Sequence, residues 1–214
     1  MPAPAIATEH EPTTAEVRLS IRKFRDYSSD LQYADFNIFE DRIGVFLNFC
    51  QTDRVFARIR EQLVSNPRVN FGEWEKQSMK TFTGWVGSAR LIFPTNEDDR
   101  VSLLYQFVEA AGDPKFGLLG KLSFWFAVDS SRYDDYLRAF SDAVMRPLFR
   151  DLGYKLEEVE ARLPDDKQAR VPANLLQIIH VEKAEVNIDR NQSFTFHESK
   201  NVQVGDGNSQ DNRE

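Results

Sequence analysis

The feature that most constrains the fold is an apolar stripe of helical period in the first quarter of the chain, between residues 36 and 50. Its members recur at i, i+3, i+7, i+10, i+11 and i+14. This spacing places them on one face of an α-helix, because a helix turns once in about 3.6 residues. The stripe therefore predicts an amphipathic helix that buries one side against other elements, and it consists of Phe36, Phe39, Ile43, Phe46, Leu47 and Cys50.

Similar patterns predict further helices. Thr13 followed by Glu16 fits a capping box, in which both side chains satisfy free amides of the first turn, and this helix is expected to run to about Tyr27. Asn96 precedes three carboxylates, which favour a helix start. Residues 118–128 are so apolar that a buried helix and a buried strand fit equally well. The other stripes are Val55, Phe56, Ile59 and Leu63; Val101, Leu104, Tyr105, Val108 and Ala111; and Tyr133, Tyr136, Leu137, Phe140, Val144 and Leu148.

These patterns predict a mainly α fold, with a helical bundle followed by a short, β-forming and partly disordered C-terminal tail. Hydrophobic residues make up 41% of the chain and include 17 Phe, which is enough to build a core. Cys50 and the three tryptophans, Trp74, Trp85 and Trp125, are expected in that core. The expected organisation is a disordered N-terminus at 1–12, a helical domain at 13–165, a linker at 166–176, a β-forming tail at 177–208 and a disordered end at 209–214.

In the tail, the helical stripes of the preceding residues give way to short runs in which apolar and polar residues alternate. The first of these runs begins at Ile178. Its end carries a β-branched residue, Gln, a β-branched residue and Gly. Such a segment suits an in-register cross-β stack, because one face interdigitates while the Gln side chains form an amide ladder at about 4.8 Å per layer. Gly permits a sharp turn, and a following Asn can ladder or adopt a left-handed conformation. The residues concerned are Val202, Gln203, Val204, Gly205 and Asn208.

A looser version of the same pattern lies upstream. Val186, Asn187 and Ile188 alternate β-branched and amide side chains, and Asn191 follows after a turn. Two such arcs, joined by the short run that contains Phe194, could give each molecule two layers of a small solenoid. These nine residues of the two arcs are the predicted self-assembly site.

The segment from Val202 to Asn208 resembles the RIP homotypic interaction motif, whose core is Val/Ile-Gln-Val/Ile-Gly followed by an Asn, and the similar bacterial amyloid signalling motifs. The resemblance covers the last 30 to 40 residues, and residues 1–165 resemble no family. It implies a signalling adaptor or effector in immune defence or regulated cell death. It further implies a partner with a matching motif, commonly a nucleotide-binding sensor protein. A helical domain followed by an amyloid-forming tail is also similar to the fungal HET-s type.

Two other interpretations of the tail stay open. The stretch from Ile178 to Gly205 could form an ordinary hairpin that packs on the helices or a strand contact between two copies, or it could remain disordered. The alternative function belongs to a different class: a helical enzyme, a nuclease or hydrolase, whose tail only makes it oligomerise.

Charge and composition argue against several classes. A net charge of −7 and a pI near 5.1 disfavour nucleic-acid binding, which needs clustered Lys and Arg. Arg18, Arg22 and Arg25 interleave with acidic residues, so we expect them on a solvated helix face. A single cysteine excludes an intrachain disulfide and a thiolate metal cluster, and the histidines lack the spacing of a zinc helix. No metal or other cofactor is therefore expected.

The expected location follows from the absence of targeting signals in the sequence. The N-terminus does not resemble a signal peptide, and no apolar run is long enough to span a membrane. We expect a cytoplasmic protein, with a membrane-directed role only weakly supported.

Overall fold

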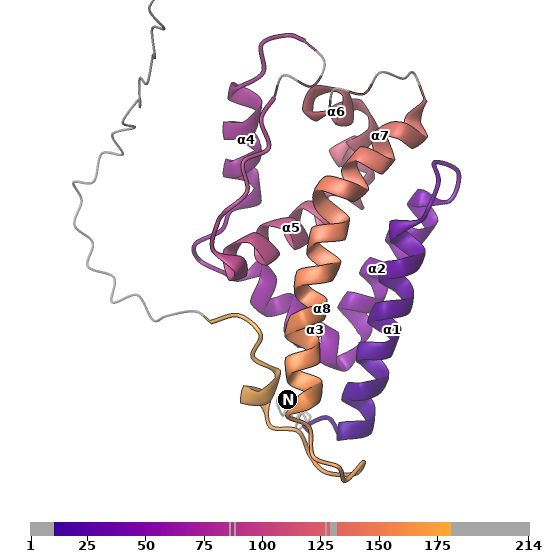
Figure 1. The fold of residues 1–214 in the computed structure, drawn as a ribbon, viewed down its shortest axis with the longest axis vertical. Helices are drawn as coiled ribbons and strands as arrows, with labels where there is room; N and C mark the ends of the chain where they lie inside the picture. Colours follow the sequence, from indigo (N-terminus) through magenta and orange to yellow (C-terminus); the bar gives the residue numbers. More distant parts are fainter. Residues whose placement is uncertain (1–10, 86, 88, 127, 129–131, 181–214) are drawn as a thin grey trace, which may run out of the picture. The chain divides into compact units, whose positions relative to one another are not determined.

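The computed structural model describes residues 11–180 except 86, 88, 127 and 129–131. Helices are the main elements of this part of the chain, together with one isolated bridge between Thr13 and Arg170 (Figure 1). The mainly α prediction is thus confirmed. In order, the elements are α1 Thr14–Gln32, α2 Phe39–Thr52, α3 Arg54–Val64, α4 Phe71–Lys80, α5 Glu97–Ala111, the 3-10 turn η1 Pro114–Phe116, α6 Leu118–Trp125, α7 Tyr133–Phe140, a π-helical segment Ser141–Met145, α8 Arg146–Ala161 and the 3-10 turn η3 Ala173–Leu176.

Helices α1, α2, α3 and α8 pack around a group of phenylalanines. Phe24 of α1 stacks on Phe56 of α3 with 5.0 Å between ring centroids. The edge of Phe149 from α8 meets Phe24 at 6.1 Å and Phe46 of α2 at 5.3 Å. All four rings are buried. Edge-to-face contacts of this kind stabilise a core beyond the area that they bury, and they join the two long helices α1 and α8, which run side by side in Figure 1.

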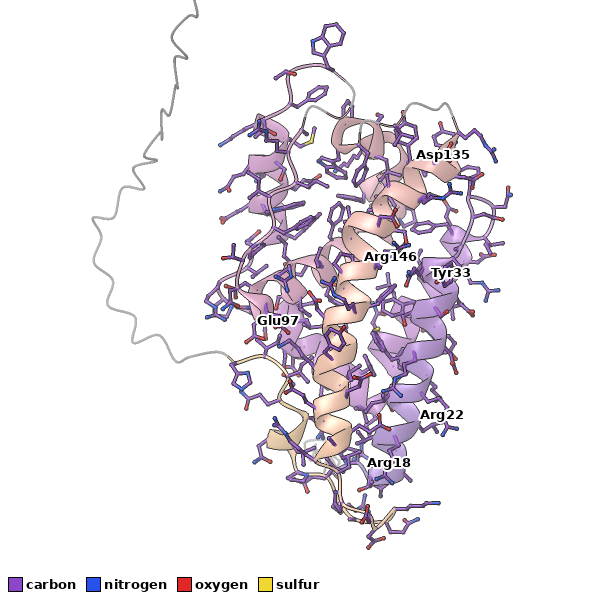
Figure 2. All side chains as sticks on the ribbon, in the orientation of Figure 1. Arg18, Arg22, Tyr33, Glu97, Asp135 and Arg146 are labelled. Atoms are coloured by element: carbon purple, nitrogen blue, oxygen red, sulfur yellow. The ribbon has the colours of Figure 1, made fainter. Side chains whose placement is uncertain are left out.

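The side of α1 that faces away from this core is polar. Arg18 and Arg22 point outward from the helix (Figure 2), and Arg22 is exposed. Arg25 forms an ion pair with Glu160 of α8 at 3.1 Å. These arginines therefore lie on a solvated face, as the sequence predicts.

Helix α5 connects the phenylalanine group to a second aromatic cluster. Phe107 of α5 is fully buried. Its ring centroid lies 5.2 Å from those of Trp125 on α6 and Phe140 on α7, and 5.4 Å from that of Trp74 on α4. Helix α5 also packs on α3 and α8. A helix that contacts several neighbours must be apolar around most of its surface, and eight of the residues in α5 are buried.

The predicted helix starts are confirmed where the structure describes them. Thr13 and Glu16 form the capping box at α1, and the Asn96 side chain accepts a hydrogen bond from the Asp99 amide at 3.1 Å. Asp53 caps α3 by accepting from the amides of Val55 and Phe56. The stretch after Gly117, for which the sequence favours neither helix nor strand, is a helix, α6.

Other expectations differ from the structure. Helix α1 continues past Tyr27 to Gln32, and Phe36 lies in the turn before α2. From Tyr133 the chain stays helical to Ala161, because the π-helical segment lets the backbone continue without a break. Trp85 is not a core residue: its side chain is 79% exposed, in a turn between glycines. Trp125 is buried and Trp74 is partly buried, as expected.

Residues 166–180, expected as a linker and the first part of the tail, instead belong to the helical domain. The Thr14 amide donates to the Ala169 carbonyl at 3.0 Å, and the Val171 amide donates to the Pro12 carbonyl at 2.8 Å. Further on, Ile178 and Ile179 are both buried. Adjacent residues of a regular strand point to opposite faces, so two buried neighbours here reflect an irregular segment that packs on the bundle. The domain therefore extends to His180, beyond the boundary expected at 165.

Candidate functional site

The nine predicted self-assembly residues lie between Val186 and Asn208, outside the described residues. The structure does describe the segment that precedes them in the chain, which ends at His180. We call this place the tail anchor. It consists of the segment Leu176–His180 and the three side chains that hold it, Gln62, Arg68 and Asp98.

Gln62 of α3 binds the backbone of the segment through both ends of its amide. Its Nε2 donates to the Leu176 carbonyl at 3.0 Å. Its Oε1 accepts from the Ile178 amide at 2.9 Å and from the Ile179 amide at 3.4 Å. A backbone group buried without a partner costs about 1–3 kcal/mol. The Gln62 side chain therefore makes it possible for Ile178 and Ile179 to be buried in an irregular segment.

Asp98, at the start of α5, holds the last described residue. Its Oδ2 accepts from the His180 amide at 2.9 Å, and its Oδ1 accepts from Lys155 Nζ of α8 at 2.6 Å. Burial acts to raise the pKa of the Asp98 carboxyl, but the hydrogen bonds from Lys155 and the His180 amide outweigh it, so the pKa lies below its usual value of 3.8. A lowered pKa means that the contact is fully formed at neutral pH and is lost only when the pH falls through that lowered value.

Arg68 is the third side chain of the tail anchor, and an ion pair with Asp99 holds its guanidinium in place. Its Nε forms an ion pair with Asp99 at 2.9 Å, and its Nη2 donates to the His180 carbonyl at 3.4 Å. The buried Asn66 donates to both Asp99 and Ser102 at 3.1 Å. The guanidinium is thus oriented by a side-chain network that reaches into the core.

Sequence reasoning missed the tail anchor because its partners are far apart in the chain. The position of Asp98 in the first turn of a helix already accounts for a carboxylate there. Its hydrogen-bond partners Lys155 and His180 lie 57 and 82 residues away. No local spacing marks Gln62, whose partners are backbone atoms more than a hundred residues along the chain.

The buried residues that the structure describes are mostly apolar and form a packed core. Cys50 is buried, as predicted, and burial raises the pKa of its thiol to about 12, so the sulfur stays protonated and a poor nucleophile at neutral pH. Among the residues that the structure describes, no group of three or more His, Cys, Asp or Glu side chains is placed to hold a metal ion. None of the described helices is long and apolar enough to cross a membrane.

Comparison with known proteins gives no relative: no family model, no curated protein and no solved structure matches the chain. The function proposed for the chain therefore depends on its own residues and geometry.

Replacing Gln62 with Leu tests the tail anchor. The substitution keeps a similar volume but leaves the Leu176 carbonyl and the amides of Ile178 and Ile179 without their partner. We expect hydrogen exchange of the Ile178 amide to become roughly ten- to a hundredfold faster, as measured by NMR on the full-length chain. Gln177→Leu is the matched control, because Gln177 is exposed and makes only a 3.4 Å contact with the Ile179 carbonyl. Unchanged exchange in Gln62→Leu would mean that apolar burial alone holds the segment.

Proposed function

We propose that the chain is a cytoplasmic signalling adaptor or effector that assembles with copies of itself through its C-terminal tail. The tails stack as cross-β layers through Val202, Gln203, Val204, Gly205 and Asn208, with the arc at Val186, Asn187, Ile188 and Asn191 as a second layer. The single observation that carries this proposal is the Val-Gln-Val-Gly segment followed by Asn, which resembles motifs that assemble in this way.

The architecture of the helical domain supports the proposal. Most members of its two aromatic clusters and of its apolar stripes are buried among the described residues, although Phe36 and Tyr133 are exposed. Stacking of identical tails would bury Val202 and Val204 in a dry interface, and removing apolar side chains from water is favourable. The tail anchor holds the chain on the helical domain as far as His180.

The spacing between the tail anchor and the motif is compatible with a crowded fibril. A compact domain of about 170 residues has a radius of gyration of roughly 15 Å and a diameter of roughly 40 Å. Tails that stack at about 4.8 Å per layer cannot carry such domains directly on the fibril. About 20 residues separate His180 from Asn201, and an extended chain of that length reaches about 70 Å. If only the arc at residues 202–208 stacks, there is one layer per molecule, and domains of this size fit around the fibril at a radius of roughly 50 Å, which lies within that reach. If both arcs stack, two layers per molecule lower the required radius to roughly 25 Å. Residues 181–185 then form the linker; they reach about 17 Å, and the domain's own radius of roughly 20 Å covers the rest.

The proposed partner is a protein that presents a matching motif, and we expect a nucleotide-binding sensor whose own assembly templates the first layers. Assembly would then bring helical domains to a high local concentration, which strengthens weak contacts between them or with a common target. Immune defence or regulated cell death is the biological setting that the resemblance implies. The net charge of −7 remains the argument against nucleic acid as the partner.

The test compares the full-length chain with a chain ended after Ala184, which retains the tail anchor and lacks all nine proposed assembly residues. The full-length protein is expected to form fibrils that bind thioflavin T, whereas the shortened protein stays monomeric with the same helical circular dichroism. If both proteins remain monomeric at several hundred micromolar, or if both form the same fibrils, the proposal is wrong.

A further inference from the structure

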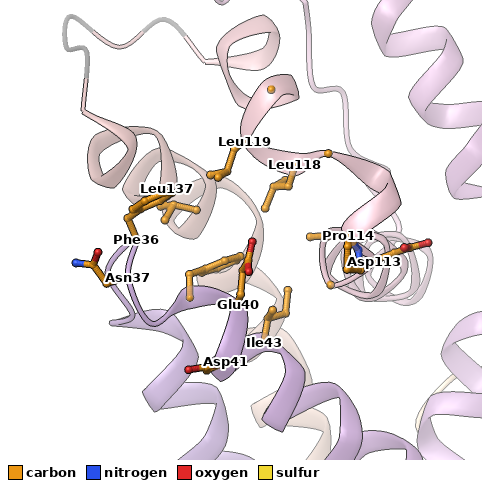
Figure 3. A pocket seen from close by; sticks show the side chains of 15 residues that line it. Phe36, Asn37, Glu40, Asp41, Ile43, Asp113, Pro114, Leu118, Leu119 and Leu137 are labelled. Carbon is orange, nitrogen blue, oxygen red and sulfur yellow. The ribbon is translucent and has the colours of Figure 1, made fainter.

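A pocket separate from the tail anchor lies between the N-terminal end of α2, the turn after α5 and the start of α6 (Figure 3). Its volume is about 660 Å³, within the range of about 300–1,000 Å³ that is typical of sites for small molecules. Segments that are far apart in sequence contribute to it, from Phe36 to Leu137.

Apolar side chains form part of the pocket wall. Ile43 of α2, Leu118 of α6 and Leu137 of α7 are nearly fully buried in the core and present their remaining surface to the pocket. Phe36 closes one side, where its ring stacks on the exposed Tyr133 at 5.1 Å, and its amide is held by Asp134 Oδ1 at 2.8 Å. This lining can take up an aliphatic or aromatic group and shield it from water.

The charged side chains that line the pocket are all acidic. These are Glu40, Asp41 and Asp113, and no Lys, Arg or His is among the lining residues. Asp113 Oδ1 accepts a hydrogen bond from the Lys115 amide at 2.9 Å, and the carboxylates of Asp41 and Asp113 point away from the pocket (Figure 3). Figure 3 shows Glu40 pointing into the pocket toward Leu118. Within the part of the chain that the structure describes, the side chains of Glu40 and Asp41 have no hydrogen bond or ion pair. Cations on neighbouring elements are engaged elsewhere: Arg42 pairs with Asp30, and Lys121 pairs with Glu75.

We infer that this pocket binds an organic cation with an apolar body, such as an alkyl- or arylammonium group. The apolar body would replace water against Ile43, Leu118 and Leu137, and the cationic head would lie beside the Glu40 carboxylate. An anion of the same shape is disfavoured because it would meet the Glu40 carboxylate. A neutral analogue gains the apolar contact but not the attraction to this carboxylate. The cation can come from a free amine or from a Lys side chain beside apolar residues in a peptide.

Binding of hexylammonium, hexanol and hexanoate to the full-length chain tests this inference, with methyl chemical shifts of Ile43, Leu118 and Leu137 as the readout. The three probes share one apolar body and differ in charge. Hexylammonium is expected to bind roughly tenfold more tightly than hexanoate at low salt, with hexanol in between. The preference should shrink at 0.5 M salt, because exposed charges are screened. Equal affinities of the three probes, or a preference for hexanoate, would overturn the inference.

Two variants test whether hexylammonium binds in this pocket. Gly120 lines the pocket, lies in helix α6 and has open space around the position of a Cβ, so Gly120→Leu fills the pocket while improving helix propensity. It should weaken hexylammonium binding more than tenfold. Gly44→Leu is the matched control, since Gly44 is also helical, has similar free space and does not line the pocket. A Gly120→Leu protein that binds as tightly as the Gly44→Leu protein would contradict the assignment.

Two further measurements complete the test: removal of a carboxylate charge from the pocket, and binding of a lysine-containing peptide. Glu40→Gln should weaken hexylammonium binding about threefold and leave hexanol binding unchanged, whereas Asp26→Asn, an exposed acid outside the pocket, should change neither. A capped Leu-Lys-Leu peptide is compared with hexylammonium under the same conditions. Tighter binding of the peptide assigns the cation to a protein segment, tighter binding of the amine assigns it to a small molecule, and failure of both to bind overturns the inference.

Discussion

Replacing Gln203 with Asp in the full-length chain is expected to abolish fibril formation while the helical domain keeps its stability. In an in-register stack this position repeats at about 4.8 Å, so every molecule would place a carboxylate next to those of its two neighbours. Two unit charges at that separation repel by about 1 kcal/mol in water and by several kcal/mol at the lower effective dielectric of a partly dry interface. The amide ladder would be lost in addition. Thioflavin T fluorescence and sedimentation are the measurements.

The chain offers a matched control for this change. Gln210→Asp introduces the same charge seven residues later, beyond the motif, and should leave assembly intact. Gln203→Asn keeps an amide that can ladder and should retain much of the assembly. If Gln203→Asp and Gln210→Asp slow fibril growth equally, only net charge matters and the proposed layer geometry is wrong.

The second large effect concerns the helical domain. Phe107→Ala is expected to lower the free energy of unfolding by about 3–5 kcal/mol, because it leaves a cavity among Trp74, Trp125 and Phe140 at the point where α5 meets three other helices. Whole domains are stable by only about 5–15 kcal/mol. The melting temperature should therefore fall by roughly 6–20 °C, as measured by circular dichroism on the chain ended after Ala184, which avoids interference from assembly.

Tyr154→Ala removes an aromatic ring of similar size from the same domain. Tyr154 is 58% exposed on α8, so the expected change is within about 0.5 kcal/mol. A loss of less than 1 kcal/mol in Phe107→Ala would show that the second aromatic cluster is loosely packed and does not join α4, α6 and α7 to α5.

The helices could be predicted from the sequence because their signals are local. Val55, Phe56, Ile59 and Leu63 share a face at helical spacing, and all four are buried in α3. Thr13 and Glu16 lie three residues apart and form the expected cap. Residues 118–128 could not be assigned to helix or strand, because a segment that is apolar all round has no contrast between its faces. Only the neighbours of this segment decide that most of it, α6, is a helix.

The end of the domain could not be predicted, because tertiary partners decide it. The alternating pattern that begins at Ile178 is typical of a strand, yet Gln62 and Asp98 hold this backbone in an irregular path. Their hydrogen bonds join residues more than eighty positions apart, and a spacing rule cannot detect such contacts. The pocket beside Glu40 has the same property, since its lining comes from several elements. For the nine proposed assembly residues the sequence remains the source of the prediction.

Stacking on identical copies must stabilise the tail more than packing on its own helical domain does. A peptide of residues 187–212 tests this requirement most directly. X-ray fibre diffraction of the peptide is predicted to show a meridional reflection at about 4.8 Å with an equatorial one near 10 Å, and its fibrils should seed the full-length chain. A peptide that stays monomeric at millimolar concentration, or whose fibrils do not seed the full-length chain, would contradict the account.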